Sequence, residues 1–237
     1  MRYLSLILIS FLCPLASFAV EADDVLFFTP FEGSTDAETS AGAGRATGRL
    51  QPGFGPGVRG RAVILGPDDF LTYAFRDNCL TDEGTVMMWV KPEWRSDDDR
   101  HHYLFRASTG NAGGKGLNAV MLYKYLKLDK LMFYTSDGRK TSPQEGRSFA
   151  SFEPLRWEPG RWIHLAATWT STLAGAEMFL YINGERRGAT SGNVCVPDTA
   201  PDVFHLGARG SGKPTWLDDV LVFSRPLLAG EIADIYA

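Results

Sequence analysis

Apolar and polar positions alternate with a period of two along most of the chain. The clearest examples are residues 70–75 (FLTYAF), 85–91 (TVMMWVK), 162–169 (WIHLAATW) and 178–182 (MFLYI). β-Branched and aromatic residues dominate these segments, and turn residues separate them, which is typical of β-strands. Many short strands with frequent turns predict a sandwich or a barrel rather than a succession of βαβ units. We therefore expect an all-β protein.

Turn-forming residues mark the connections between these strands. The pair Asn183-Gly184 tolerates positive φ and predicts a tight hairpin turn directly after the strand at 178–182. Residues 33–60 are rich in Gly, Ser, Thr and Ala. We interpret this stretch as a long loop or as a pair of weak strands.

One helical segment is expected, at the carboxyl end of the chain. In residues 227–236 the apolar side chains of Leu228, Ile232 and Ile235 are spaced as on one side of a helix. This spacing predicts a short helix that lies on a sheet.

The alternation assigns side chains to two faces, because successive side chains of a strand point in opposite directions. The set expected in the core consists of Val86, Met88, Val90, Ile163, Leu165, Ala167, Met178, Leu180 and Ile182. If these strands are neighbours, the opposite face carries Trp89, Trp162, His164, Phe179 and Tyr181.

This aromatic face is the predicted binding site, because sugar rings stack on the flat apolar surfaces of Trp and Tyr. The alternative is that a loop or the terminal helix covers the face, so that its aromatic side chains form a second core. We expect His164 to be a structural residue rather than a catalytic one.

The first residues have the features of an export signal. A positive start at Arg2 precedes an apolar run at residues 4–12, and Ser17-Phe18-Ala19 matches a small-x-small cleavage site. We therefore assign residues 1–19 to a signal peptide and expect an extracytoplasmic protein, secreted or periplasmic. No later segment has the length of a membrane-spanning helix.

Cleavage would remove Cys13 and leave Cys79 and Cys195. An even pair of cysteines in an exported protein predicts a disulfide, with two separate buried thiols as the alternative.

The charge of the chain argues against a nucleic-acid partner. The formal net charge is −4, and the basic residues are scattered rather than gathered in a stripe. Proteins that bind nucleic acid present a basic surface to the phosphates. We expect a glycan or polysaccharide as the partner, with a protein partner as an open alternative.

Three segments together resemble the laminin-G-like family of concanavalin A-like lectins and glucanases. They are GTVMMWVKP at 84–92, WEPGRWIHLAATW at 157–169 and LDDVLVFSRPL at 217–227, with the hairpin LYING at 180–184 between the last two. The resemblance implies a two-sheet antiparallel jelly-roll sandwich with a short C-terminal helix. It also implies that residues 24–237 form a single domain.

The same resemblance implies one structural calcium ion. Glu32, in the sequence FEG, matches an acidic position near the first strand of the family, and Asp218 matches the aspartate of its closing strand. A calcium ion needs several oxygen ligands, some of which backbone carbonyls supply. The alternative for Asp218 is a hydrogen bond to a loop.

The family includes lectins, adhesion modules, glucanases and lyases, so the fold alone does not fix the function. Glucanases of this fold carry alternating acidic residues on one strand, because hydrolysis needs two carboxylates on the same face. No E-x-D-x-E pattern occurs in the sequence. We therefore expect a non-catalytic carbohydrate-binding or adhesion-type module. A polysaccharide hydrolase or lyase, and a structural protein-interaction domain, stay open as alternatives.

Overall fold

The computed structural model describes residues 20–48, 52–110, 117–139, 146–173, 175–207 and 212–237. The predicted signal peptide, residues 1–19, lies outside these ranges. Within them, no helix is long and apolar enough to cross a lipid bilayer.

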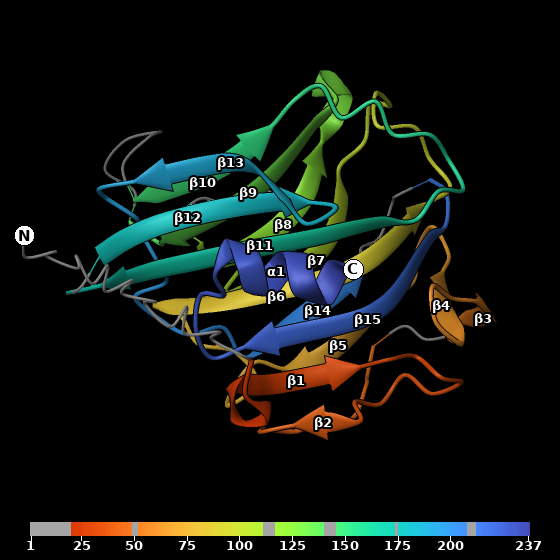
Figure 1. Cartoon of the computed structure of the whole chain (residues 1–237), viewed down its shortest axis with the longest axis horizontal. Helices are drawn as coiled ribbons and strands as arrows, with labels where there is room; N and C mark the ends of the chain where they lie inside the picture. The colour runs from red at the N-terminus through yellow and green to blue at the C-terminus, as the bar shows by residue number, and fades with distance from the viewer. Residues whose placement is uncertain (1–19, 49–51, 111–116, 140–145, 174, 208–211) are drawn as a thin grey trace, which may run out of the picture.

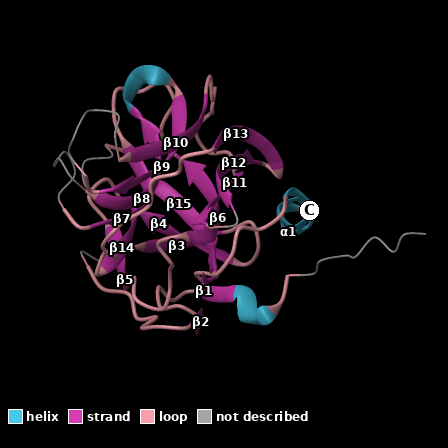
Figure 2. Ribbon diagram, turned by 90° about the vertical axis from the view of Figure 1, so that its left-hand side faces the viewer, coloured by secondary structure: helices cyan, strands magenta, loops and turns pink. Residues whose placement is uncertain are grey.

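The described residues form two antiparallel sheets that pack face to face (Figures 1 and 2). The first sheet has the strand order β13-β12-β11-β6-β15-β1-β2, and β4 pairs with β15 and with β3. Its strands are β1 (Val25–Thr29), β2 (Thr39–Ser40), β3 (Gly53–Pro56), β4 (Arg61–Leu65), β6 (Glu83–Pro92), β11 (Ile163–Thr172), β12 (Gly175–Ile182), β13 (Glu185–Ser191) and β15 (Thr215–Phe223). We call it the nine-stranded sheet.

The second sheet has the strand order β10-β9-β8-β7-β14-β5, and we call it the six-stranded sheet. Its strands are β5 (Phe70–Ala74), β7 (His102–Ser108), β8 (Asn118–Tyr125), β9 (Lys130–Asp137), β10 (Arg147–Phe152) and β14 (Val203–Gly207). The helices are the 3-10 turns η1 (Ala22–Asp24) and η2 (Leu126–Leu128) and the α-helix α1 (Ala229–Tyr236).

The two-sheet antiparallel sandwich and its C-terminal helix confirm the predicted fold class. All nine side chains that the alternation assigned to the core lie in the main hydrophobic cluster between the sheets. Asn183 and Gly184 both have positive φ, at 51° and 75°, and connect β12 to β13 as predicted. The stretch at 33–60 contains the two short strands β2 and β3.

The predicted disulfide is absent from this structure, because Cys79 and Cys195 are both free thiols. Cys79 is packed into the main core, and burial raises the pKa of its thiol. The backbone of Cys195 is held elsewhere: its N–H donates to Ser148 Oγ at 2.9 Å, and its carbonyl accepts from Thr135 Oγ1 at 2.6 Å.

Strand β15 changes its neighbour half-way along the nine-stranded sheet. Residues 215–217 pair with β4, whereas residues 220–223 pair with β1, and β6 lies along the other side of both halves. The change falls at an irregularity after Asp218, where Asp219 adopts a left-handed φ of 43°. Such a bulge bends a strand and redirects its side chains.

Asp218 and Glu32 fix the turn between β3 and β4, which lies beside this bulge. Asp218 is fully buried, and its Oδ2 accepts the N–H of Val58 at 2.8 Å. A Cβ atom on Gly57 would collide with the same oxygen, so only glycine fits there. The carboxylate of Glu32, just beyond β1, accepts the N–H of Arg61 at 3.1 Å. The turn between β3 and β4 is thus fixed from both sides.

Helix α1 is attached to the nine-stranded sheet by an ion-pair network and by apolar packing (Figure 1). Arg225 donates to Asp24 through Nε, and to both carboxylate oxygens of Glu231 through its two terminal nitrogens. Glu231 also accepts the N–H of Leu228 at the start of the helix. Ile232, fully buried, faces the sheet.

We expect Arg225→Gln to lower the free energy of unfolding by about 1–3 kcal/mol, because charge-assisted hydrogen bonds to two carboxylates are lost. The control is Arg161→Gln, whose side chain is 78% exposed and lies 3.7 Å from Glu158. An exposed pair of this kind contributes less than about 1 kcal/mol. Urea denaturation measures both variants. Equal losses in the two would contradict the assigned role of Arg225.

Candidate functional site

Helix α1 covers much of the aromatic face that the sequence analysis predicted as the binding site. Tyr181 is buried beneath the helix together with Met87 and Ala166, and Ile232 packs on them. Phe179 is partly buried against the same cluster. These side chains form a second core. For Phe179 and Tyr181 the structure thus shows the alternative, in which the terminal helix covers the aromatic face.

Trp162 does not join that cluster. It lies beside Lys91, whose ammonium group is 5.1 Å from the Trp162 ring and 3.2 Å from the Trp216 ring. A cation over an aromatic ring is attracted by the negative face of that ring. Desolvation by these neighbours lowers the pKa of Lys91. The five predicted residues therefore belong to different surroundings, and Trp162 lies just before β11 rather than in a strand.

Trp89 and His164 lie at the edge of α1. The ring of Trp89 stacks on the ring of Tyr236 in the helix, with 5.6 Å between the ring centroids. The centroid of the His164 ring lies 5.1 Å from that of Trp89. His164 is 2% exposed, and desolvation lowers the pKa of its imidazole to about 4, so the ring is neutral at neutral pH. Its Nδ1 atom is buried without a hydrogen-bond partner.

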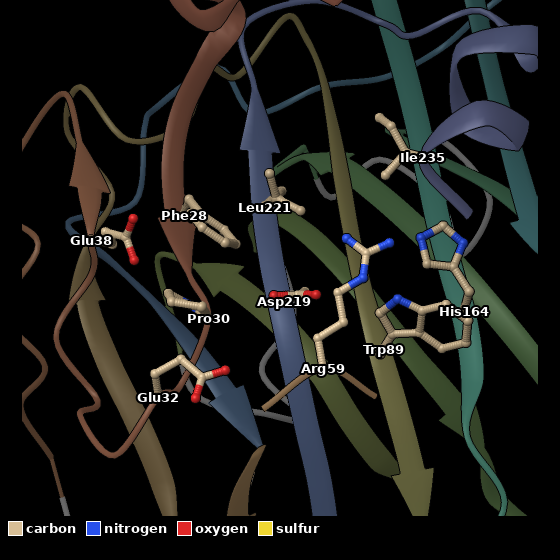
Figure 3. A pocket seen from close by; sticks show the side chains of 10 residues that line it. All are labelled: Phe28, Pro30, Glu32, Glu38, Arg59, Trp89, His164, Asp219, Leu221 and Ile235. Atoms are coloured by element: carbon tan, nitrogen blue, oxygen red, sulfur yellow. The ribbon is translucent and has the colours of Figure 1, made fainter. Parts of the chain in front are cut away.

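A cleft of about 450 Å³ opens beside these two rings, between α1, β1 and the turn that precedes β4 (Figure 3). Its apolar part is formed by Trp89 together with Phe28, Pro30, Leu221 and Ile235. These side chains come from β6, β1, β15 and α1, so the cleft exists only in the assembled sheet.

The polar part of the cleft is formed by Glu32, Glu38, Arg59, His164 and Asp219. Asp219 points into the cleft from the bulge in β15, and the side chain of Arg59 extends across the opening (Figure 3). Burial raises the pKa of the Asp219 carboxyl, the positive charge of Arg59 opposes this effect, and the negative charge of Glu32 adds to it. The cleft thus contains three carboxylates and one guanidinium.

The predicted calcium ligands have other partners in this structure. Both carboxylate oxygens of Glu32 accept the N–H of Arg61, and the Asp218 carboxylate accepts those of Val58 and Asp219. Among the described residues, no three His, Cys, Asp or Glu side chains are placed to hold a metal ion. The expected hydrogen bond from Asp218 to a loop is present, while the calcium prediction stays untested.

A second group of aromatic side chains lies on the outer face of the six-stranded sheet. Registered cross-strand pairs form a continuous row across all six strands. In order from β5 to β10, the row consists of Thr72, His205, Arg106, Met121, Tyr134 and Phe149. We call this row, together with Tyr103, Tyr123, Tyr125 and Met132, the tyrosine face. No described helix or strand lies over it, and α1 is on the opposite side of the sandwich (Figure 2).

The tyrosine face combines stacked rings with basic groups. Tyr103 and Tyr123 stack at 5.2 Å, and burial raises the pKa of the Tyr123 hydroxyl. Arg106 lies 5.5 Å from the Tyr103 ring, and its Nε is buried without a partner. Phe149 is 52% exposed. Met121 and Tyr123 are buried, so the apolar area that reaches the surface comes from Phe149 and from the partly buried side chains around them. The Arg106 guanidinium lies among these rings and donates to the carbonyl of Gly110 at 2.9 Å.

Sequence reasoning missed both the tyrosine face and the polar half of the cleft. A signal for the tyrosine face was present, because Met121, Tyr123 and Tyr125 alternate along one strand and Met132 and Tyr134 along the next. The polar half of the cleft has no comparable signal. Arg59 and Asp219 come together only through the bulge in β15.

A family model described as the concanavalin A-like lectin/glucanases superfamily matches residues 66–233. The chain belongs to this superfamily. The match confirms the resemblance seen in the three sequence motifs. No curated protein matches the chain.

Solved structures of the same architecture include toxin and enzyme domains. The binding domain of botulinum neurotoxin DC in complex with SialylT has a TM-score of 0.66 and 12% identity, over 91% of this chain and 51% of that chain. The receptor binding domain of botulinum neurotoxin type G has a TM-score of 0.64 and 13% identity, over 91% and 51%. This chain thus spans about half the length of those chains.

A third structure is matched over nearly its whole length. It is domain 4 of AbnA, a GH43 extracellular arabinanase from Geobacillus stearothermophilus, in complex with arabinotriose. The TM-score is 0.62 and the identity 16%, over 90% of this chain and 98% of that chain. At these identities, the likeness shows a shared fold.

The buried carboxyl of Asp218 predicts a pH dependence of stability. Burial outweighs its hydrogen bonds and raises its pKa to about 6, from an ordinary value of 3.8. A group with a raised pKa in the folded state binds its proton more tightly there. Its contribution to stability is therefore fully present below pH 3.8 and is lost as the pH rises through 6.

We expect the stability of the wild type relative to Asp218→Asn to fall by up to about 3 kcal/mol between pH 4 and pH 7. Urea denaturation at a series of pH values measures this difference. Asp234→Asn, which removes an exposed carboxylate of α1, is the control. A difference between wild type and Asp218→Asn that does not change with pH would contradict the raised pKa.

Proposed function

We propose that this chain is an exported, non-catalytic carbohydrate-binding module whose glycan ligand lies on the tyrosine face. One observation carries the proposal: the row that crosses the six-stranded sheet combines the rings of Tyr134 and Phe149 with the polar side chains of Arg106 and His205. This row lies on the face away from α1.

The chemistry of the row suits a sugar chain. A pyranose ring has an apolar face, which stacks on aromatic rings, and hydroxyl groups around its edge, which bind polar side chains. Neighbouring strands lie about 4.8 Å apart, so a row across six strands extends over roughly 24 Å. A surface of this length accommodates several consecutive sugar rings.

Two further observations support binding rather than hydrolysis. No residue of the row is a carboxylate, whereas glycoside hydrolysis uses two. Two of the structures with this fold are complexes, one with SialylT and one with arabinotriose. The proposed place outside the cytoplasm follows from the signal-peptide pattern in residues 1–19.

We expect Phe149→Ala to weaken binding of a neutral oligosaccharide by about 2- to 10-fold, because one stacked ring contributes roughly 0.5–1.5 kcal/mol. Tyr134→Ala, which removes the ring next to Phe149 in the row, should weaken binding as well. Isothermal titration with arabinotriose and with a sialylated trisaccharide measures the affinities.

Leu173→Ala is the matched control, because Leu173 is a fully exposed apolar side chain at the end of β11 in the other sheet. Its affinity should equal that of the wild type. Unchanged binding in both Phe149→Ala and Tyr134→Ala would exclude the tyrosine face as the site. Failure to bind any member of a broad glycan panel would contradict the proposed function itself.

A further inference from the structure

The cleft beside α1 is separate from the tyrosine face, because its lining belongs to the nine-stranded sheet and to α1 (Figure 3). We propose that this cleft is a second sugar-binding site, which takes one uncharged pyranose ring at the end of a glycan chain. The proposal goes beyond the proposed function, since the two sites share no residue and either one could exist without the other.

The cleft is held in shape by hydrogen bonds between carboxylates and the backbone. The carboxylates of Asp218 and Glu32 fix the turn that carries Arg59, through the N–H groups of Val58 and Arg61. The bulge in β15 directs Asp219 toward the same space. A site formed in this way needs little rearrangement to bind a ligand, which lowers the entropy cost of binding.

Two polar groups on the wall accept or donate no hydrogen bond within the described protein, although the charge of Arg59 acts on one of them, Asp219. His164 is 98% buried, lines the cleft and has an unpaired Nδ1. The carboxylate of Asp219 is half-buried and makes no hydrogen bond or ion pair with the described residues. Buried polar groups are nearly always hydrogen-bonded, so unpaired groups on a cavity wall indicate a ligand or ordered water.

The polar and apolar side chains that line the cleft together indicate which kind of ligand fits it. Asp219 and Glu38 accept hydrogen bonds, Arg59 donates them, and Trp89 supplies an apolar ring beside them. A sugar ring has hydroxyl groups that both donate and accept, together with an apolar face. A volume of about 450 Å³ lies within the usual range for small-molecule sites.

The charge of the wall argues against an acidic sugar. Three carboxylates (Glu32, Glu38 and Asp219) oppose the single guanidinium of Arg59. A uronate or a sialic acid in the cleft would be repelled by the excess negative charge. An uncharged ring avoids this repulsion.

The experiment compares the methyl glycosides of glucose, galactose and mannose with the corresponding uronates, by saturation-transfer NMR and titration on the full mature chain. We expect at least one neutral glycoside to bind about tenfold more tightly than its uronate. Asp219→Asn should weaken that binding by about tenfold, since a hydrogen bond to a charged group is lost. Asn tolerates the positive φ of this position, so the fold is retained.

Two further variants complete the test. Asp234→Asn removes a carboxylate of α1 outside the cleft and should bind as the wild type does. Glu38→Gln removes one negative charge from the wall and should reduce the ratio between the affinities for the neutral glycoside and for its uronate.

The outcomes separate this proposal from the first one. Binding that Tyr134→Ala abolishes and Asp219→Asn leaves unchanged would overturn the cleft as a sugar site and leave the tyrosine face in place. Binding of uronates as tight as that of the neutral glycosides would overturn the proposed selectivity, as would tighter binding of the corresponding amino sugars. Loss of binding in Asp219→Asn alone would support the cleft independently of the tyrosine face.

Discussion

The buried carboxylate of Asp218 holds the point at which the nine-stranded sheet changes its edge. β15 pairs first with β4 and then with β1, and a change of this kind leaves backbone N–H groups that need acceptors. The Asp218 oxygens accept those of Val58 and Asp219. The bulge that follows then turns Asp219 out of the core and into the cleft. The hydrogen bonds of Asp218 therefore stabilise the point where the sheet changes its edge strand, and they also help to position Asp219 in the wall of the candidate sugar site.

Helix α1 determines which aromatic side chains are core and which are surface. It covers Tyr181 and part of Phe179, and it leaves Trp89 at its margin, where the cleft opens. Because the helix occupies the nine-stranded sheet, the face of the six-stranded sheet is left for an extended ligand (Figure 2). Two sites on opposite faces would let one copy of the chain contact two glycan strands. Such bridging would suit an adhesion-type module, which the sequence analysis predicted alongside a carbohydrate-binding one.

The fold could be predicted from the sequence because it depends on local alternation and on turn chemistry. Val86 and Leu165 are core residues as expected, and Asn183 begins the predicted turn. The binding face could not be predicted in the same way. Period-two alternation shows that Tyr181 points away from the core, but not that a helix will lie over it. Arg59 and Asp219 are far apart in sequence and meet only where the sheet changes its edge, which no local pattern records.

The central claim is that glycans bind this chain on the surfaces that α1 leaves open. The most direct test is a titration of the isotope-labelled mature chain with an oligosaccharide that it binds. The measured quantity is the NMR chemical shift of each backbone amide. The account predicts that the shifts are concentrated on β7, β8, β9 and β10, and around Asp219 beside α1. Shifts concentrated on the residues beneath α1, such as Tyr181 and Met87, would contradict it, because binding would then require the helix to leave the sheet.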